Sequence, residues 1–171
     1  MMGRKTRTAL AAAVLLLCFA GAALGEGARE IARHGAWVVM AGESDGQRTC
    51  FATTQPRTRV PTGMARDQTY VYISAWPKDG IKAEFSVATG TAVRPGSKVM
   101  VIVGEYRYAL FTANERAYVA DPTAELKLID AMKKGSSMVI ESIDDSGRLV
   151  SDIYSLVGLA QTLAAITKGC G

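Results

Sequence analysis

The chain has 171 residues, of which 49% are hydrophobic and 21% are charged, and its formal net charge is +4. This length is enough for one domain with a core of its own, and a second domain is not expected. The charge does not indicate a nucleic-acid-binding protein, because that class needs clustered basic residues and three of those here lie in a segment that is expected to be removed.

That segment, residues 1–25, has the order of a secretory signal peptide. Arg4, Lys5 and Arg7 precede an apolar run over residues 9–20, which ends in small residues. The run is shorter than the roughly 20 apolar residues that cross a bilayer, and no later apolar run is longer. The sequence therefore predicts an exported protein whose mature part is soluble and has no transmembrane segment.

Cleavage is expected after Gly25, with Ala22 as the alternative, because small residues stand at both sites. A lipid-modified N-terminal cysteine at Cys18 is less favoured, since Leu17 occupies a position where that processing requires a small residue. Loss of the segment removes three of the 20 basic residues, so 17 remain against 16 acidic ones and the net charge falls to +1.

Two cysteines, Cys50 and Cys170, remain in the mature chain. In an oxidising compartment they are expected to pair, and the bond would close a loop of more than 100 residues. Two free buried thiols are the alternative, which such a compartment disfavours.

Most of the mature chain has the pattern of a β protein. Residues 26–35 are polar and irregular and are predicted to form a flexible leader. A domain over residues 36–171 follows, in which β-branched and aromatic runs alternate with turn residues, as is typical of a sandwich or barrel. Strands are predicted over residues 36–41, 47–53, 69–75, 81–88, 98–103, 106–112 and 116–119.

Two helices and a hairpin are predicted after residue 120. Asp121 is a suitable N-cap for a helix over residues 122–134, and Gly135 is a suitable left-handed stop. A hairpin over residues 137–154 turns at 144–147, where Asp144 and Asp145 are interpreted as turn residues. A last helix over 156–168, capped by Ser155 and stopped by Gly169, carries an apolar stripe that leads to Cys170.

No catalytic, cofactor or metal site is predicted. The single histidine, His34, lies in the predicted leader, so the domain has no Ser-His-Asp or Cys-His arrangement. The spacings typical of zinc, calcium and phosphate-binding motifs are absent from the sequence. Asp152 and Ser155 are interpreted as a strand residue and a helix cap, and a hydrolase that uses this pair is an alternative.

A candidate binding loop lies between the second and third predicted strands. Arg57, Arg59 and Arg66 make this loop positively charged, and clustered arginines bind carboxylate, phosphate or sulfated groups. A solvated connection is the more frequent alternative. Tyr70, Tyr72, Tyr106 and Tyr108 suit cross-strand pairing, although a tyrosine-rich face also suits protein binding.

Three segments resemble the invasion-associated locus B family: CFATTQP from Cys50 with Arg59 and Pro61 after it, AMKKG at 131–135, and DIYSLVG at 152–158 before Cys170. The resemblance covers essentially the whole mature chain. It implies an immunoglobulin-like β-sandwich with one helix inserted before the last hairpin, a C-terminal helix and the Cys50–Cys170 disulfide. No catalytic residue is carried over. Some members have another cysteine soon after the first tryptophan, whereas Val38 to Ala41 follow Trp37 here, so no second disulfide is expected.

The resemblance also implies a compartment and a class of function. Members are exported by Gram-negative bacteria to the periplasm or the cell surface, and the family name records an association with host-cell entry. A non-enzymatic protein is therefore expected, which contacts a protein in the envelope or on a host surface without a cofactor, a metal or nucleic acid. A periplasmic hydrolase and a structural or stress-related envelope factor are the alternatives.

Overall fold

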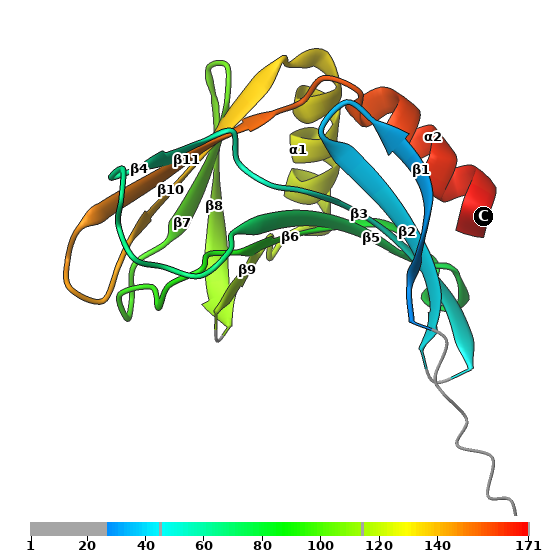
Figure 1. Cartoon of the computed structure of the whole chain (residues 1–171), viewed down its shortest axis with the longest axis horizontal. Helices are drawn as coiled ribbons and strands as arrows, with labels where there is room; N and C mark the ends of the chain where they lie inside the picture. The colour runs from blue at the N-terminus through cyan, green and yellow to red at the C-terminus, as the bar shows by residue number, and fades with distance from the viewer. Residues whose placement is uncertain (1–26, 45, 114, 171) are drawn as a thin grey trace, which may run out of the picture.

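The computed structural model describes residues 27–44, 46–113 and 115–170 (Figure 1). The predicted signal peptide and both candidate cleavage sites lie outside these residues. Eleven strands form one antiparallel sheet in the order β1-β2-β3-β5-β6-β9-β8-β7-β10-β11-β4. They are β1 (Arg29–His34), β2 (Trp37–Ser44), β3 (Gln47–Thr54), β4 (Thr58–Val60), β5 (Tyr70–Trp76), β6 (Ile81–Ala88), β7 (Val99–Val103), β8 (Tyr106–Ala113), β9 (Arg116–Tyr118), β10 (Ser137–Ile143) and β11 (Leu149–Ser155).

The sheet divides into two parts at β8. The first half of β8, residues 106–110, pairs with β7, and its second half, residues 111–113, pairs with β9. Strands β7, β10, β11 and β4 therefore lie to one side of β8 and the remaining strands to the other, as Figure 1 shows. The mainly β prediction with two helices and one disulfide is confirmed, and the two layers of the expected sandwich belong to one continuous sheet.

Alternation along the strands sends one set of side chains into a single core. On β5, Val71, Ile73 and Ala75 are buried, whereas the alternating Tyr70 and Tyr72 are only half-buried. Each fully buried valine or isoleucine side chain contributes roughly 1.5–3 kcal/mol to the stability of the fold. The largest core side chains come from both parts of the sheet and from both helices: Trp37, Phe85, Leu110, Leu128, Met132, Met138, Tyr154, Leu159 and Ile166.

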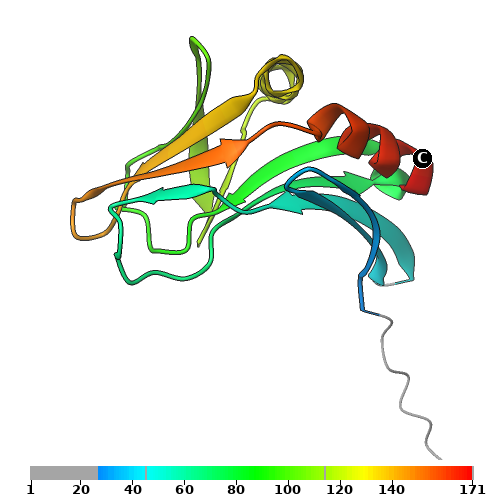
Figure 2. The ribbon, with the colours of Figure 1, turned by 45° about the horizontal axis from the view of Figure 1, so that its top comes forward.

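Both helices pack against the core side of the sheet. Helix α1 (Pro122–Lys134) contacts β6, β7 and β8, and α2 (Leu159–Cys170) contacts β1, β2 and β3. Figure 2 shows α2 in red lying over the blue and cyan strands. The opposite face of these strands is left without a helix among the described residues.

The predicted start of α1 is confirmed, and the predicted form of its end is wrong. Asp121 accepts hydrogen bonds from the backbone N–H groups of Thr123 and Ala124 at 3.0 and 3.2 Å. Gly135, however, has φ −84° and ψ 161°, an extended conformation rather than a left-handed one. A Cβ at Gly135 would lie 2.9 Å from a methyl group of Val103, so close packing against β7, not backbone conformation, is what requires glycine here.

The prediction of a flexible leader over residues 26–35 is wrong for the residues that form β1. This strand pairs with β2 over Arg29–His34, with an irregularity between Glu30 and Ala32. The turn after it packs against the chain that enters α2, since a Cβ at Gly35 would lie 2.6 Å from the carbonyl oxygen of Val157. The charged side chains of β1 point outward and concealed its strand character.

The last helix begins three residues later than predicted and continues through Gly169. Ser155 accepts a hydrogen bond from Val157 N at 3.3 Å, which forms a local turn rather than a helix cap. Gly158 then turns the chain with φ +93°, and the helix starts at Leu159. As the predicted stripe requires, Leu159, Ile166 and Cys170 are buried against the sheet.

Substitution of Gly158 by alanine tests how closely the turn between β1 and β2 packs against the chain that enters α2. An added Cβ would collide with the backbone carbonyl of His34, in addition to straining a left-handed conformation. The strain costs about 1–2 kcal/mol and the collision about 1–3 kcal/mol more. Gly104→Ala is the matched control, because Gly104 has φ +58° and nothing lies within 4 Å of its Cβ position. Urea unfolding should show the larger loss for Gly158→Ala, and equal losses would contradict this packing.

Candidate functional site

The helix-free face of the sheet carries a group of aromatic side chains around one arginine. Because successive strand residues point to opposite faces, these outward positions alternate with the buried ones. Register places Tyr72 of β5 opposite Ser86 of β6, and Ser86 opposite Tyr118 of β9. We call the following set the aromatic face: Phe51, Tyr70, Tyr72, Phe111, Arg116 and Tyr118.

Tyr72 lies at the centre of the contacts in this set. Its ring centroid lies 6.1 Å from that of Phe51 and 5.8 Å from that of Tyr70. The guanidinium carbon of Arg116 lies 4.7 Å from the Tyr72 centroid, within the range of a cation–π interaction. The rings of Phe111 and Tyr118 form a second pair at 5.8 Å. The aromatic face therefore consists of two groups of rings on neighbouring strands, and a positively charged group is held against one of them.

The chemistry of the aromatic face suits binding rather than catalysis. Its side chains offer apolar ring surface, phenolic hydroxyls and one cation. Phe111 is 40% exposed, and Phe51, Tyr70, Tyr72 and Tyr118 are partly exposed. Tyr, Phe and Arg are among the types enriched where proteins meet. The aromatic residues bring a large contact area with few rotatable bonds, and Arg brings a planar set of hydrogen-bond donors. Solvent-exposed aromatic rings of this kind can be desolvated by a partner.

The sequence had indicated part of this face. Tyr70 and Tyr72 were among the tyrosines predicted to pair across strands or bind protein, and they lie within it. Tyr106 and Tyr108 lie outside it, since they pair with Val103 and Val101 of β7 in the other part of the sheet. Phe51, Phe111, Arg116 and Tyr118 were missed, although the alternation along residues 47–53, 106–112 and 116–119 was a usable signal.

The three arginines of the candidate binding loop have different surroundings. Arg57 is exposed. Arg59 is half-buried and donates to the backbone carbonyl of Asp67 at 2.7 Å. The side chain of Arg66 is only 1% exposed and forms a two-pronged ion pair with Asp152 of β11, with Nη1 2.7 Å from Oδ2. Arg66 is thus occupied inside the fold, and anion binding by this loop stays a prediction that rests on Arg57.

The Arg66–Asp152 pair fastens the loop to the inner side of the sheet. Strand β4 pairs with β11 at the sheet edge, where Arg59 lies opposite Asp152. Tyr154, two residues along β11, is fully buried beside this pair, and burial raises the pKa of its phenol well above the ordinary value of 10.0. The buried Arg66–Asp152 ion pair and the pairing of β4 with β11 therefore hold the segment that connects β3 to β5.

Asp152 and Ser155 do not form a catalytic pair. They lie three residues apart on one strand, so their side chains point to opposite faces of the sheet. Asp152 is bound to Arg66, and Ser155 Oγ accepts a hydrogen bond from Val157 N. His34 is half-buried at the end of β1. Among residues 27–44, 46–113 and 115–170, no group of three or more histidine, cysteine, aspartate or glutamate side chains is placed to hold a metal ion.

Asp144 organises the hairpin turn in which the sequence placed it. Its carboxylate accepts hydrogen bonds from Ser146 Oγ at 2.6 Å, from Arg148 N at 2.8 Å and from Arg148 Nε at 2.9 Å. The bond from Ser146 and those from Arg148 lower the pKa of Asp144. The interpretation as a turn residue is confirmed.

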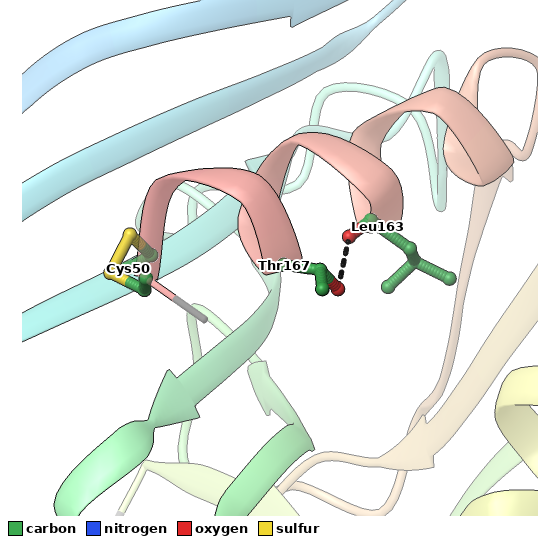
Figure 3. Close-up of a disulfide and its surroundings, with 4 residues drawn as sticks. Cys50, Leu163 and Thr167 are labelled. Carbon is green, nitrogen blue, oxygen red and sulfur yellow. Dashed lines mark hydrogen bonds between the residues drawn. A yellow bond between two sulfur atoms is a disulfide. The ribbon is translucent and has the colours of Figure 1, made fainter.

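The predicted disulfide is present and joins the sheet to the last helix. Cys50 lies on β3 and Cys170 ends α2, with their Cα atoms 5.9 Å apart (Figure 3). Cys50 is fully buried and Cys170 is 6% exposed. The bond therefore fastens the end of α2 to the core side of the sheet, opposite the aromatic face.

Comparison with known proteins agrees with this architecture. The family model described as "Invasion associated locus B (IalB) protein" matches residues 37–167. The crystal structure of invasion associated protein B from Bartonella henselae resembles this chain with a TM-score of 0.58, over 82% of this chain and 98% of that one. The two share 13% sequence identity, so this likeness concerns the fold. No functionally curated protein matches the chain.

None of the helices in the described part of the chain is both long and apolar enough to cross a bilayer. The family match runs from Trp37 at the start of β2 to Thr167 in α2 and so includes nearly all of the sheet, both helices and the candidate face. The chain belongs to the Invasion associated locus B (IalB) protein family.

Proposed function

We propose that this IalB-family chain is an exported, non-enzymatic binding protein that contacts a partner protein through the aromatic face. The observation that carries the proposal is the cluster of Tyr72, Arg116 and the surrounding rings on a sheet face that neither helix covers. Antiparallel sheets normally present polar side chains on their solvated face, so rings at these positions need another explanation.

Export to the periplasm or the cell surface is part of the proposal. The order of residues 1–25 favours a cleaved signal peptide, and the Cys50–Cys170 bond suits an oxidising compartment. The family description associates these proteins with invasion, which supports a partner in the envelope or on a host surface. The hydrolase alternative has little support at Asp152 and Ser155, because Asp152 forms an ion pair with Arg66 and its side chain points to the opposite face of the sheet from that of Ser155.

Photocrosslinking in the native cell tests the proposal. A benzophenone side chain at position 111 is expected to yield a discrete crosslinked protein, whereas the same group at position 106 is not. Position 106 is the matched control, since Tyr106 is 64% exposed but lies outside the aromatic face. Arg116→Ala should weaken the crosslink at position 111, because truncation of a central interface residue costs about 2 kcal/mol, or roughly 30-fold in affinity.

The outcomes separate the rival functions. Equal or absent crosslinking at both positions would contradict the proposed face. A crosslink to an outer-membrane or periplasmic protein alone would identify an envelope factor without a host role. Protease treatment of intact cells decides the side of the outer membrane, because only a surface-exposed domain would be cut.

A further inference from the structure

A second candidate binding site lies on the opposite side of the sheet, beside the disulfide. A cavity of about 300 Å³ opens between the C-terminal turns of α2 and the connection from β5 to β6. Ile166 of α2 and Ala75 of β5 line it, and Ile81 at the start of β6 lines its exposed side. Cys170 lies at the wall as well, so the disulfide fixes the helix end that bounds the cavity.

Irregular backbone in the β5–β6 connection explains why the helix and sheet do not close here. The pairing register shifts between Ser74 and Trp76, and a 3-10 turn follows over Pro77–Asp79. Gly80 then takes a left-handed conformation with φ 71° before β6 begins. A bulge and a tight turn change the course of the chain beside α2, as bulges do where a sheet is shaped around a site.

The wall of the cavity has little free hydrogen-bonding capacity. Of the described residues that line it, Thr167 is the one with a hydroxyl group, and Thr167 Oγ1 donates to the carbonyl oxygen of Leu163 at 3.1 Å (Figure 3). Ile81 is 37% exposed, although it is a large apolar side chain. An apolar ligand would remove this surface from water without leaving a buried polar group unpaired.

One positive charge stands at the cavity. Among the described residues that line it, Lys82 is the one with a charged side chain, and it is exposed. The adjoining turn carries one charge of each sign, Lys78 next to Pro77 and Asp79 next to Gly80, so the positive charge at the cavity rests on Lys82. A ligand with an apolar body and an anionic end therefore matches both the wall and its rim.

We infer that this cavity binds the hydrocarbon tail of a single-chain amphiphile whose anionic head group pairs with Lys82. Its volume is about twice the roughly 150 Å³ of an apolar cavity that binds benzene, which indicates a tail of about ten to twelve carbons. The carboxylate of a free fatty acid and the phosphate of a lysophospholipid share the required chemistry. The site is on the α2 side of the sheet and does not rest on the aromatic face.

Titration calorimetry of the disulfide-bonded protein with sodium decanoate tests the inference. Saturable binding is expected, at least tenfold tighter than that of decyltrimethylammonium, which has the same tail and the opposite charge. Ile81→Asp should lower decanoate affinity at least tenfold, because it places a carboxylate in the apolar wall. Lys82→Glu should lower it about fivefold, as expected for an exposed charge partner.

Two exposed positions elsewhere supply matched controls. Leu126→Asp on α1 repeats the apolar-to-acid change of Ile81→Asp, and Lys98→Glu repeats the charge reversal of Lys82→Glu. Both controls should bind decanoate like the unchanged protein. No saturable binding, equal binding of the cationic amphiphile, or equal effects of Ile81→Asp and Leu126→Asp would each overturn the inference.

A second titration distinguishes the two sources of ligand. Decanoyl lysophosphatidylglycerol added to decanoate-loaded protein should displace the fatty acid if the site serves phospholipids, and should leave it bound if the site accepts free acids alone. Either result supports an anionic amphiphile. Spin-labelled decanoate should broaden the amide signals of Ile81 and Thr167 and leave that of Tyr118 unchanged. Broadening at Tyr118 in place of Ile81 would locate the ligand elsewhere and contradict the site.

Discussion

Replacement of Cys50 and Cys170 together by alanine is expected to lower the free energy of unfolding by about 5 kcal/mol. The two residues are 120 positions apart, and in the chain-entropy model a crosslink over such a span removes about this much conformational freedom from the unfolded chain. Urea unfolding of the purified mature protein measures the change.

Reduction of the unchanged protein is the control for this prediction. Dithiothreitol should shift its unfolding midpoint to that of the double-alanine variant, since both lack the same bond. A loss below about 1 kcal/mol would mean that the bond does not constrain the chain as the fold requires, and would also weaken the proposed shape of the cavity at the end of α2.

Asp152→Ala is expected to destabilise the fold by about 3–5 kcal/mol. The substitution leaves the guanidinium of Arg66 buried without its partner, and an uncompensated buried charge is far more costly than a lost surface pair. Asp130→Ala is the matched control, because Asp130 pairs with Lys133 at 2.9 Å but is 62% exposed, so its loss should cost less than about 1 kcal/mol.

A double variant separates the role of the charges from that of the packing. Arg66→Met combined with Asp152→Leu should regain most of the stability lost in Asp152→Ala, because apolar residues of similar volume often replace a buried ion pair without loss. If Asp152→Ala unfolds at the same urea concentration as the unchanged protein, the ion pair does not hold the loop, and Asp152 is again a candidate residue for the hydrolase alternative.

Local patterns predicted most of the strands, and they failed where pairing is non-local. Nine of the eleven strands were predicted with ends within three residues of the observed ones. β1 was missed because it pairs on one side alone, so its outward positions tolerate charge. β4 was missed because it has three residues and its strand conformation depends on β11, far along the chain.

The candidate sites show the same division. Cysteine counting and the apolar stripe of the last helix were enough to predict the disulfide. No local signal could show that Arg66 meets Asp152, since 86 positions separate them. The cavity near Lys82 arises from a bulge and a turn beside α2, and residue types do not specify that geometry. The aromatic face was partly predictable. The alternation of residue types along each strand is visible in the sequence, but the order of the strands in the sheet, which brings these side chains together, is not.

Within residues 27–44, 46–113 and 115–170, the continuous sheet of eleven strands has two unpaired edges, at β1 and at β4. On β1, Arg29, Glu30 and Arg33 are exposed, and on β4 three residues are followed by Pro61, which has no backbone N–H to offer. Charge, shortness and proline are the devices that keep sheet edges from recruiting strands of neighbouring molecules. The molecule can therefore expose the aromatic face to solvent and still resist assembly into fibrils at high local concentration.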